Sequence, residues 1–176
     1  MTDPRPISTA VEATTTLPTI PADTLASRCE FYRRTCELDA RVRPEMEAIT
    51  VAASNRLGAV TMPAELAARV RLHLQHQGVR VGPIISHPRA SRWTFLVRPD
   101  IPDDAATFAR LFGIQVDVAR PGTEIALPSP VRRHIGFRCW SQPATDAYRP
   151  SGLIVLAAID ACTGVPRRRA RHAHSR

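Results

Sequence analysis

The order of strand-like and helix-like segments from residue 57 onward constrains the fold more than any other feature of this chain. Short runs rich in branched and aromatic residues, which favour strands, alternate with longer amphipathic runs, which favour helices. The predicted strands cover 57–62, 82–86, 92–97, 114–118, 123–127 and 135–140, and the predicted helices cover 63–77 and 102–112. The resulting β-α-β-β-α-β order predicts an α+β fold with a ferredoxin-like, RRM-like split βαβ sheet, extra C-terminal strands, and helices mainly on one face.

Proline and glycine residues mark the expected ends of these helices. Pro63 stands where the first helix begins and Gly78 where it stops, which follows the usual placement of the two residues. Pro102, with the acidic residues Asp103 and Asp104 behind it, opens the second helix, and acidic groups are favourable in that first turn. A last apolar helix is expected at about 152–162.

The chain divides into four regions by composition. Residues 1–22 are rich in threonine and proline and are expected to form a disordered tail. Residues 23–55 form an N-terminal helical segment, residues 56–164 form the α+β domain, and residues 165–176 form a basic disordered tail.

The N-terminal helical segment contains one clear helix and one ambiguous stretch. Asp23 is the expected N-cap, apolar residues then recur at helical spacing to Ala40, and Pro44 ends or kinks the helix. Residues 44–55 suit a short helix that runs into a loop, which we prefer, although the sequence from Ile49 also suits a strand.

Arginine supplies every basic side chain of this protein. All 24 basic residues are arginine, the formal charge is +8 and the isoelectric point is about 10.8. A basic protein attracts polyanions, so nucleic acid is the expected partner. The absence of lysine, together with abundant alanine and proline, also indicates the codon bias of a GC-rich bacterial genome, so arginine is partly a default cation here.

Compartment and cysteine chemistry follow from what the sequence contains. The first residues lack the apolar core of a signal peptide, and the longest apolar run, 153–159, is too short to span a bilayer. We therefore expect a cytoplasmic protein with no membrane association and with reduced cysteines. Cys29, Cys36, Cys139 and Cys162 are expected to be small buried side chains, with a zinc site involving His87 or His134 as the alternative.

Four segments resemble a known family. They are Ser86–Val97, Gly113–Asp117, Pro121–Ser129 and Phe137–Trp140: a turn and strand, a strand pair ending in Pro-Ser, and a strand with tryptophan. In this order they resemble the primase-polymerase domain of the archaeo-eukaryotic primase superfamily, as found in bacterial bifunctional DNA primase/polymerase proteins. The resemblance covers roughly residues 57–145 and implies an RRM-like sheet and a link to nucleic acid.

The resemblance also implies acidic metal ligands that this chain does not carry at the expected place. Two carboxylates on an early strand would hold the catalytic divalent ions, but the corresponding region, 57–62, contains none. Glu45 and Glu47 would share one face only if they lay on a strand. The family's strand histidine corresponds to Trp93, His87 is expected in the preceding turn, and Asp117 matches a third family carboxylate.

Arginine residues are therefore the candidate nucleic-acid ligands. The candidates are Arg89, Arg92, Arg132, Arg133, Arg167, Arg168, Arg169 and Arg171. Trp93, Phe95 and Trp140 could stack on bases if they lay exposed on the sheet, but we expect them to pack in the core.

Three functions remain in order of preference. The first is a non-catalytic primase-polymerase-like domain that binds nucleic acid through arginine. The second is a protein-interaction or regulatory module built on the same fold, for an unknown protein partner. The third is an active nucleotidyltransferase with an unrecognised metal site. The preferred interpretation has no catalytic residue, no metal and no cofactor.

Overall fold

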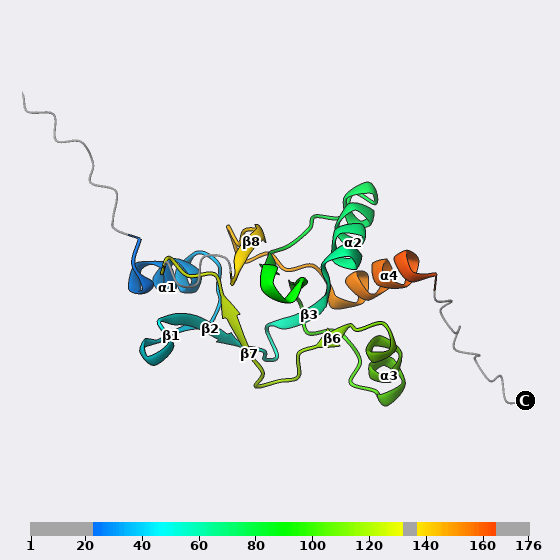
Figure 1. The fold of residues 1–176 in the computed structure, drawn as a ribbon, viewed down its shortest axis with the longest axis horizontal. Helices are drawn as coiled ribbons and strands as arrows, with labels where there is room; N and C mark the ends of the chain where they lie inside the picture. Colours follow the sequence, from blue (N-terminus) through cyan, green and yellow to red (C-terminus); the bar gives the residue numbers. More distant parts are fainter. Residues whose placement is uncertain (1–22, 132–136, 165–176) are drawn as a thin grey trace, which may run out of the picture.

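Two antiparallel sheets organise the part of the chain that the structure, a computed structural model, describes: residues 23–131 and 137–164 (Figure 1). The larger sheet has the strand order β6-β3-β5-β4-β8, and the smaller sheet has the order β1-β2-β7. Four α-helices accompany them in these ranges, so the chain has the predicted α+β class.

The larger sheet has the topology that the sequence predicts. Its strands are β3 (Gly58–Pro63), β4 (Ile84–His87), β5 (Arg92–Val97), β6 (Asp117–Val118) and β8 (Cys139–Gln142). Strand β5 lies between β3 and β4 and is antiparallel to both, so β3 and β4 run parallel on either side of it. Together with the position of β6 beside β3, this is a split βαβ arrangement.

Three helices cover one face of the larger sheet. They are α2 (Ala64–His76), α3 (Ala105–Gly113) and α4 (Gly152–Thr163), which lie to the right of β3 in Figure 1. Their apolar side chains form one core with the alternate strand residues Val60, Met62, Phe95 and Val97. Because successive strand residues point to opposite faces, the residues between them belong to the other side of the sheet.

The smaller sheet packs against part of that other side. It contains β1 (Ala40–Arg43), β2 (Ala48–Ala52) and β7 (Glu124–Leu127), and α1 (Leu25–Arg34) covers it. Strand β7 was expected to extend the larger sheet, but it pairs with β2. In that position Ile125 and Leu127 are buried with Ile49, Ala59 and Leu96, so the pairing joins the two sheets through one apolar cluster.

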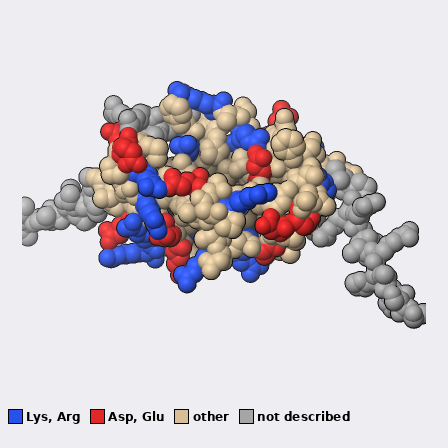
Figure 2. Space-filling view, turned by 90° about the horizontal axis from the view of Figure 1, so that it is seen from below, with Lys and Arg blue, Asp and Glu red and all other residues tan. Residues whose placement is uncertain are grey.

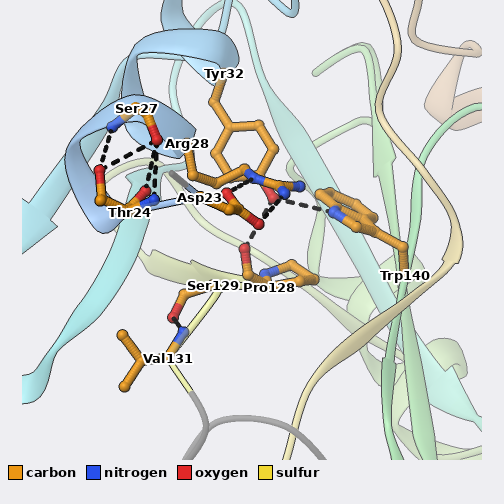
Figure 3. A network of polar contacts seen from close by, with 9 residues as sticks. All are labelled: Asp23, Thr24, Ser27, Arg28, Tyr32, Pro128, Ser129, Val131 and Trp140. Atoms are coloured by element: carbon orange, nitrogen blue, oxygen red, sulfur yellow. Dashed lines mark hydrogen bonds and ion pairs between the residues drawn. The ribbon is translucent and has the colours of Figure 1, made fainter. Parts of the chain in front are cut away.

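The N-terminal segment departs from the sequence prediction at both ends of its helix. Thr24, and not Asp23, caps α1: its hydroxyl accepts a hydrogen bond from Ser27 N at 3.1 Å in a capping box, while Asp23 pairs with Arg28 (Figure 3). The helix ends at Arg34, well before Pro44, because Glu37 adopts a left-handed backbone conformation and the chain becomes extended at β1.

The ambiguous stretch after β1 contains a strand. Residues Pro44–Met46 form a single 3₁₀ turn, and β2 follows at once. The preferred prediction of a short helix and loop is therefore wrong beyond residue 47. Ile49 and Val51 lie on one face of β2, and both are buried against the larger sheet.

Two of the three helices on the larger sheet begin later than predicted. Asp104 is the N-cap of α3, because its carboxylate accepts a hydrogen bond from Thr107 N at 2.8 Å. Pro63 stands at the N-cap of α2 and not inside the helix. Gly164 ends α4 with a φ of 70°, in the left-handed region that glycine adopts without strain.

Tyr32 connects α1 to both sheets (Figure 3). Its hydroxyl donates a hydrogen bond to Pro128 O, just after β7, at 2.8 Å and accepts one from Trp140 Nε1, on β8, at 3.0 Å. Only 1% of Tyr32 is exposed, and burial raises the pKa of its phenol. The neutral hydroxyl therefore satisfies two groups that are shielded from water.

We expect Tyr32→Phe to lower the free energy of unfolding by about 1–2 kcal/mol, because it leaves Pro128 O and Trp140 Nε1 without their partner. Chemical denaturation measures the change. Tyr148→Phe is the matched control: the Tyr148 hydroxyl donates to Arg80 O at an exposed position, so that change should stay within about 0.5 kcal/mol. Equal effects of the two substitutions would contradict the assignment of Tyr32.

Asp100 caps α4 from outside the helix. Its carboxylate accepts hydrogen bonds from Ser151 Oγ at 2.6 Å, Gly152 N at 2.6 Å and Leu153 N at 3.3 Å. Burial alone would raise the pKa of this carboxyl, but the hydrogen bonds outweigh it and the pKa lies below its usual value. The loop after β5 thereby holds the start of α4.

The lowered pKa of Asp100 gives a pH dependence with a defined sign. A carboxyl whose pKa is lower in the folded state adds stability above its unfolded pKa, about 3.9, and this stability is lost as the pH falls through the folded value. We expect Asp100→Asn to destabilise the protein at neutral pH and to have a progressively smaller effect below about pH 4. Asp103→Asn is the control, because the Asp103 carboxylate is exposed and accepts no hydrogen bond from the described residues. A pH-independent effect of Asp100→Asn would contradict the assignment.

Candidate functional site

A cleft opens on the face of the larger sheet opposite the helices, where the smaller sheet leaves that face uncovered. Its volume is about 820 Å³, within the usual range for ligand sites. Strands β3, β4 and β5 form its floor through Ala59, Thr61, His87, Arg92 and Thr94, and α3, β6, β7 and Arg138 form its walls.

The floor of the cleft carries a short polar chain. Thr61 and Thr94 face each other across the β3–β5 pair with their hydroxyl oxygens 2.8 Å apart, and His87 Nε2 lies 2.8 Å from the Thr94 hydroxyl. The strand alternation that sends Trp93 and Phe95 to the helices sends Thr94 to the cleft.

His87 lies at the end of β4 and not in the turn that follows, as the sequence had suggested. Its side chain is half-buried. Burial lowers the pKa of His87, and the positive charges of Arg138 and Arg92 lower it further. The imidazole is therefore neutral at neutral pH, and it can donate or accept one hydrogen bond at each ring nitrogen according to its tautomer.

Both carboxylates that line the cleft are paired with arginine. Arg92 donates to Asp117 Oδ2 at 2.6 Å, and the same guanidinium reaches Gln115 O at 2.9 Å and Thr61 O at 3.2 Å. Glu124, at the start of β7, forms an ion pair with Arg43. Neither carboxylate is therefore available to a ligand without loss of an ion pair.

Two other arginines of the cleft have no carboxylate partner among the described residues. The guanidinium of Arg120 lies 5.1 Å from the centre of the Phe108 ring, in a cation–π contact. Arg138 lies close enough to His87 to lower its pKa. These two side chains bring unpaired positive charge to opposite walls of the cleft.

Aromatic surface is also present at the cleft. Phe112, on α3, lines it and is 78% exposed, which makes it the most exposed large apolar side chain that the structure describes. Phe108 lies one helical turn earlier on the same wall. An exposed ring beside unpaired arginines is the combination with which proteins stack and hold the bases and phosphates of single strands.

The structure locates two of the eight arginines predicted to contact nucleic acid. Arg92 lies in the cleft, whereas Arg89 lies outside it with its guanidinium 3.5 Å from the centre of the exposed Phe137 ring. The other six candidates, Arg132, Arg133, Arg167, Arg168, Arg169 and Arg171, lie outside the described residues.

The aromatic residues singled out from the sequence serve the core. Phe95 is 1% exposed, Trp93 packs on the helix-covered core, and Trp140 packs on the core shared by the two sheets. The aromatic side chains of the cleft, Phe108 and Phe112, escaped sequence analysis because their helical spacing reads as a buried face. Arg120 and Arg138 escaped it because neither lies in a charge cluster.

The two glutamates considered as metal ligands do not share a strand. Glu45 lies in the 3₁₀ turn, and Glu47 follows it with a left-handed backbone, so both are exposed and outside the cleft. Among residues 23–131 and 137–164, no group of three or more His, Cys, Asp or Glu side chains is placed to hold a metal ion. Cys29 and Cys36 are buried thiols, Cys162 is half-buried and Cys139 is exposed.

Charge on the molecular surface is mixed. Figure 2 views the molecule from below relative to Figure 1 and shows arginine and acidic side chains interspersed over this side of the molecule. A broad positive face is therefore not what would attract a polyanion here, and the local pairing of individual arginines decides which of them are available.

Comparison with known proteins returned no match: no family model, no curated protein and no solved structure resembles the chain significantly. Within the described ranges, no helix has the length and apolar character needed to cross a membrane.

The environment of His87 gives a titration test of the cleft. Because the charge of Arg138 lowers the pKa of His87, Arg138→Gln should raise that pKa toward the ordinary value of about 6.5. The histidine signals in two-dimensional NMR spectra, followed against pH, measure the change. Arg69→Gln, on an exposed position of α2, removes the same charge away from the cleft and should leave the titration unchanged; a shift with Arg69→Gln alone would show that the assignment is wrong.

Proposed function

We propose that this protein is a non-catalytic, primase-polymerase-like domain that binds single-stranded nucleic acid in the cleft through arginine and phenylalanine. The observation that carries the proposal is the exposed ring of Phe112 beside Arg120 and Arg138, two arginines with no carboxylate partner among the described residues. Binding of this kind depends on phosphate charge and base stacking and is largely independent of sequence.

The segments that resemble the primase-polymerase family meet at this cleft. Residues 86–97 supply His87, Arg92 and Thr94 to its floor, and residues 113–129 supply β6 and β7 to its wall. The resemblance thus concerns the residues around one site and not segments scattered over the surface. This convergence supports descent from a nucleic-acid enzyme.

The absence of catalysis in the proposal rests on the side chains of the cleft. Where the family resemblance implies paired carboxylates, the floor presents Ala59 and Thr61 from β3. The remaining acids, Asp117 and Glu124, would have to leave Arg92 and Arg43 to hold metal ions. Chemistry that depends on two metal ions needs carboxylates free to neutralise them, and this arrangement offers an anion site in their place.

Substitutions on the cleft wall test the proposal. We expect Phe112→Ala to weaken binding of a single-stranded oligonucleotide by about 1–3 kcal/mol through the loss of stacking. The double substitution Arg120→Gln with Arg138→Gln should flatten the log–log salt dependence by about 1.4, at about 0.7 for each phosphate contact. Fluorescence anisotropy at several salt concentrations measures both effects.

Leu72→Ala is the matched control for Phe112→Ala, because Leu72 is a 50% exposed side chain of α2 that does not line the cleft. Equal binding by wild type and both cleft variants would contradict the proposal and favour a protein-interaction module. Template-directed primer extension by the wild type with Mn²⁺ would instead assign a nucleotidyltransferase.

A further inference from the structure

Two further hollows adjoin the cleft and extend it around the rim of the smaller sheet. The first is lined by the connections that precede β3 and follow β5 and β6, and it shares Phe108, Ala119 and Arg120 with the cleft. The second lies between α1 and the end of β5, has a volume of about 880 Å³, and shares Leu57, Arg98 and Pro99 with the first. Shared walls make the three hollows neighbours along one course.

Arginine recurs at each stage of this course. Arg120 stands where the cleft meets the first hollow, and Arg98 stands where the first hollow meets the second. The second hollow adds Arg33, Arg56 and Arg149, so four arginines line it against two carboxylates, Glu37 and Asp39. Asp39 is already paired with Arg41.

The arginines of the second hollow are not neutralised by the fold. Arg149 is 8% exposed, and its guanidinium donates only to backbone carbonyls, those of Cys36, Asp146 and Tyr148, while its Nε has no partner. The side chains of Arg56 and Arg98 form no hydrogen bond or ion pair with other described residues and line the hollow at its solvent side. Positive charge that is held in a hollow without a carboxylate favours an anion.

The course is long enough to tell a short ligand from a long one. Arg92 and Arg98 lie on the same face of β5, six positions apart, which places their Cα atoms about 20 Å from each other at about 3.3 Å per residue. Leu96, between them, is buried beneath the smaller sheet, so a ligand must pass around the rim by way of Arg120. At about 3.4 Å per stacked nucleotide, the path to Arg98 takes six or more nucleotides, by this estimate about six at least.

We infer that the cleft and the two hollows form one continuous groove for a single strand of nucleic acid, with Arg120, Arg98 and Arg56 contacting successive phosphates. This inference rests on the proposed function and adds the course and the length of the bound strand. Its consequence is a dependence on oligonucleotide length: a strand of about 4 nucleotides fills the cleft alone, and a strand of about 16 nucleotides reaches the second hollow.

The experiment measures binding of both oligonucleotides, as fluorescein-labelled oligo-dT, to the full chain and to the double variant Arg56→Gln with Arg98→Gln. For the longer strand the variant should bind more weakly, with a salt slope flatter by about 1.4; for the shorter strand it should bind as the wild type does. Arg69→Gln with Arg110→Ala is unsuitable as a control because Arg110 pairs with Asp160, so Arg69→Gln alone serves as the charge control and should change neither affinity.

The outcomes separate this inference from the proposed function. Equal weakening for both lengths, or no weakening for the longer strand, would show that the groove does not exist while the cleft still binds. Failure of the wild type to bind either oligonucleotide would overturn both. Amide hydrogen exchange of the wild type gives an independent check that needs no variant: the longer strand, and not the shorter, should protect residues 54–57.

Discussion

The two-sided burial of strand β5 is the constraint on which the rest of the structure depends. Trp93, Phe95 and Val97 pack toward α2, α3 and α4, and Leu96 packs beneath the smaller sheet. Each side chain can satisfy only one face, because successive residues of a strand point in opposite directions. The strand therefore fixes where the helices lie, where the smaller sheet lies, and which part of the second face stays open. Thr94 and Arg92 occupy that open part, and the cleft is the consequence.

The smaller sheet completes this arrangement by covering only half of the second face. Its attachment relies on the apolar cluster around Ile49 and Ile125 and on the Tyr32 hydroxyl, which joins α1 to the segments next to β7 and β8. Because β7 lies in this sheet while β6 lies in the larger one, the 118–123 connection crosses between them and carries Arg120 to the rim of the cleft. The same connection also lines the first of the two further hollows. One change of sheet by the chain thus shapes both the proposed site and the proposed groove.

Pairing decides which charges of this arginine-rich chain can act on a ligand. Arg92 and Arg43 are engaged by the two acids of the cleft, whereas Arg120 and Arg138 are not engaged by any described carboxylate. Exposed ion pairs contribute little to stability, but they remove cations from the set available to a polyanion. The formal charge of +8 is therefore a weak guide to function, and the distribution of unpaired guanidinium groups is a better one. This is the physical basis for proposing a local, stacking-assisted site and not binding by a broad positive surface.

The sequence by itself determined the local elements from residue 57 onward and the α+β class, because hydrophobic periodicity and the positions of proline and glycine act over a few residues. It also indicated that Trp93 and Phe95 belong to a core. Only the tertiary structure decided that β7 pairs with β2, that residues 48–52 form a strand, and that His87 faces the cleft beside Thr94. These outcomes depend on contacts between residues far apart in the chain, which no local pattern encodes. The same holds for the candidate site: Phe112 looks like a core residue on its helix, and its exposure follows from where α3 lies against the sheet.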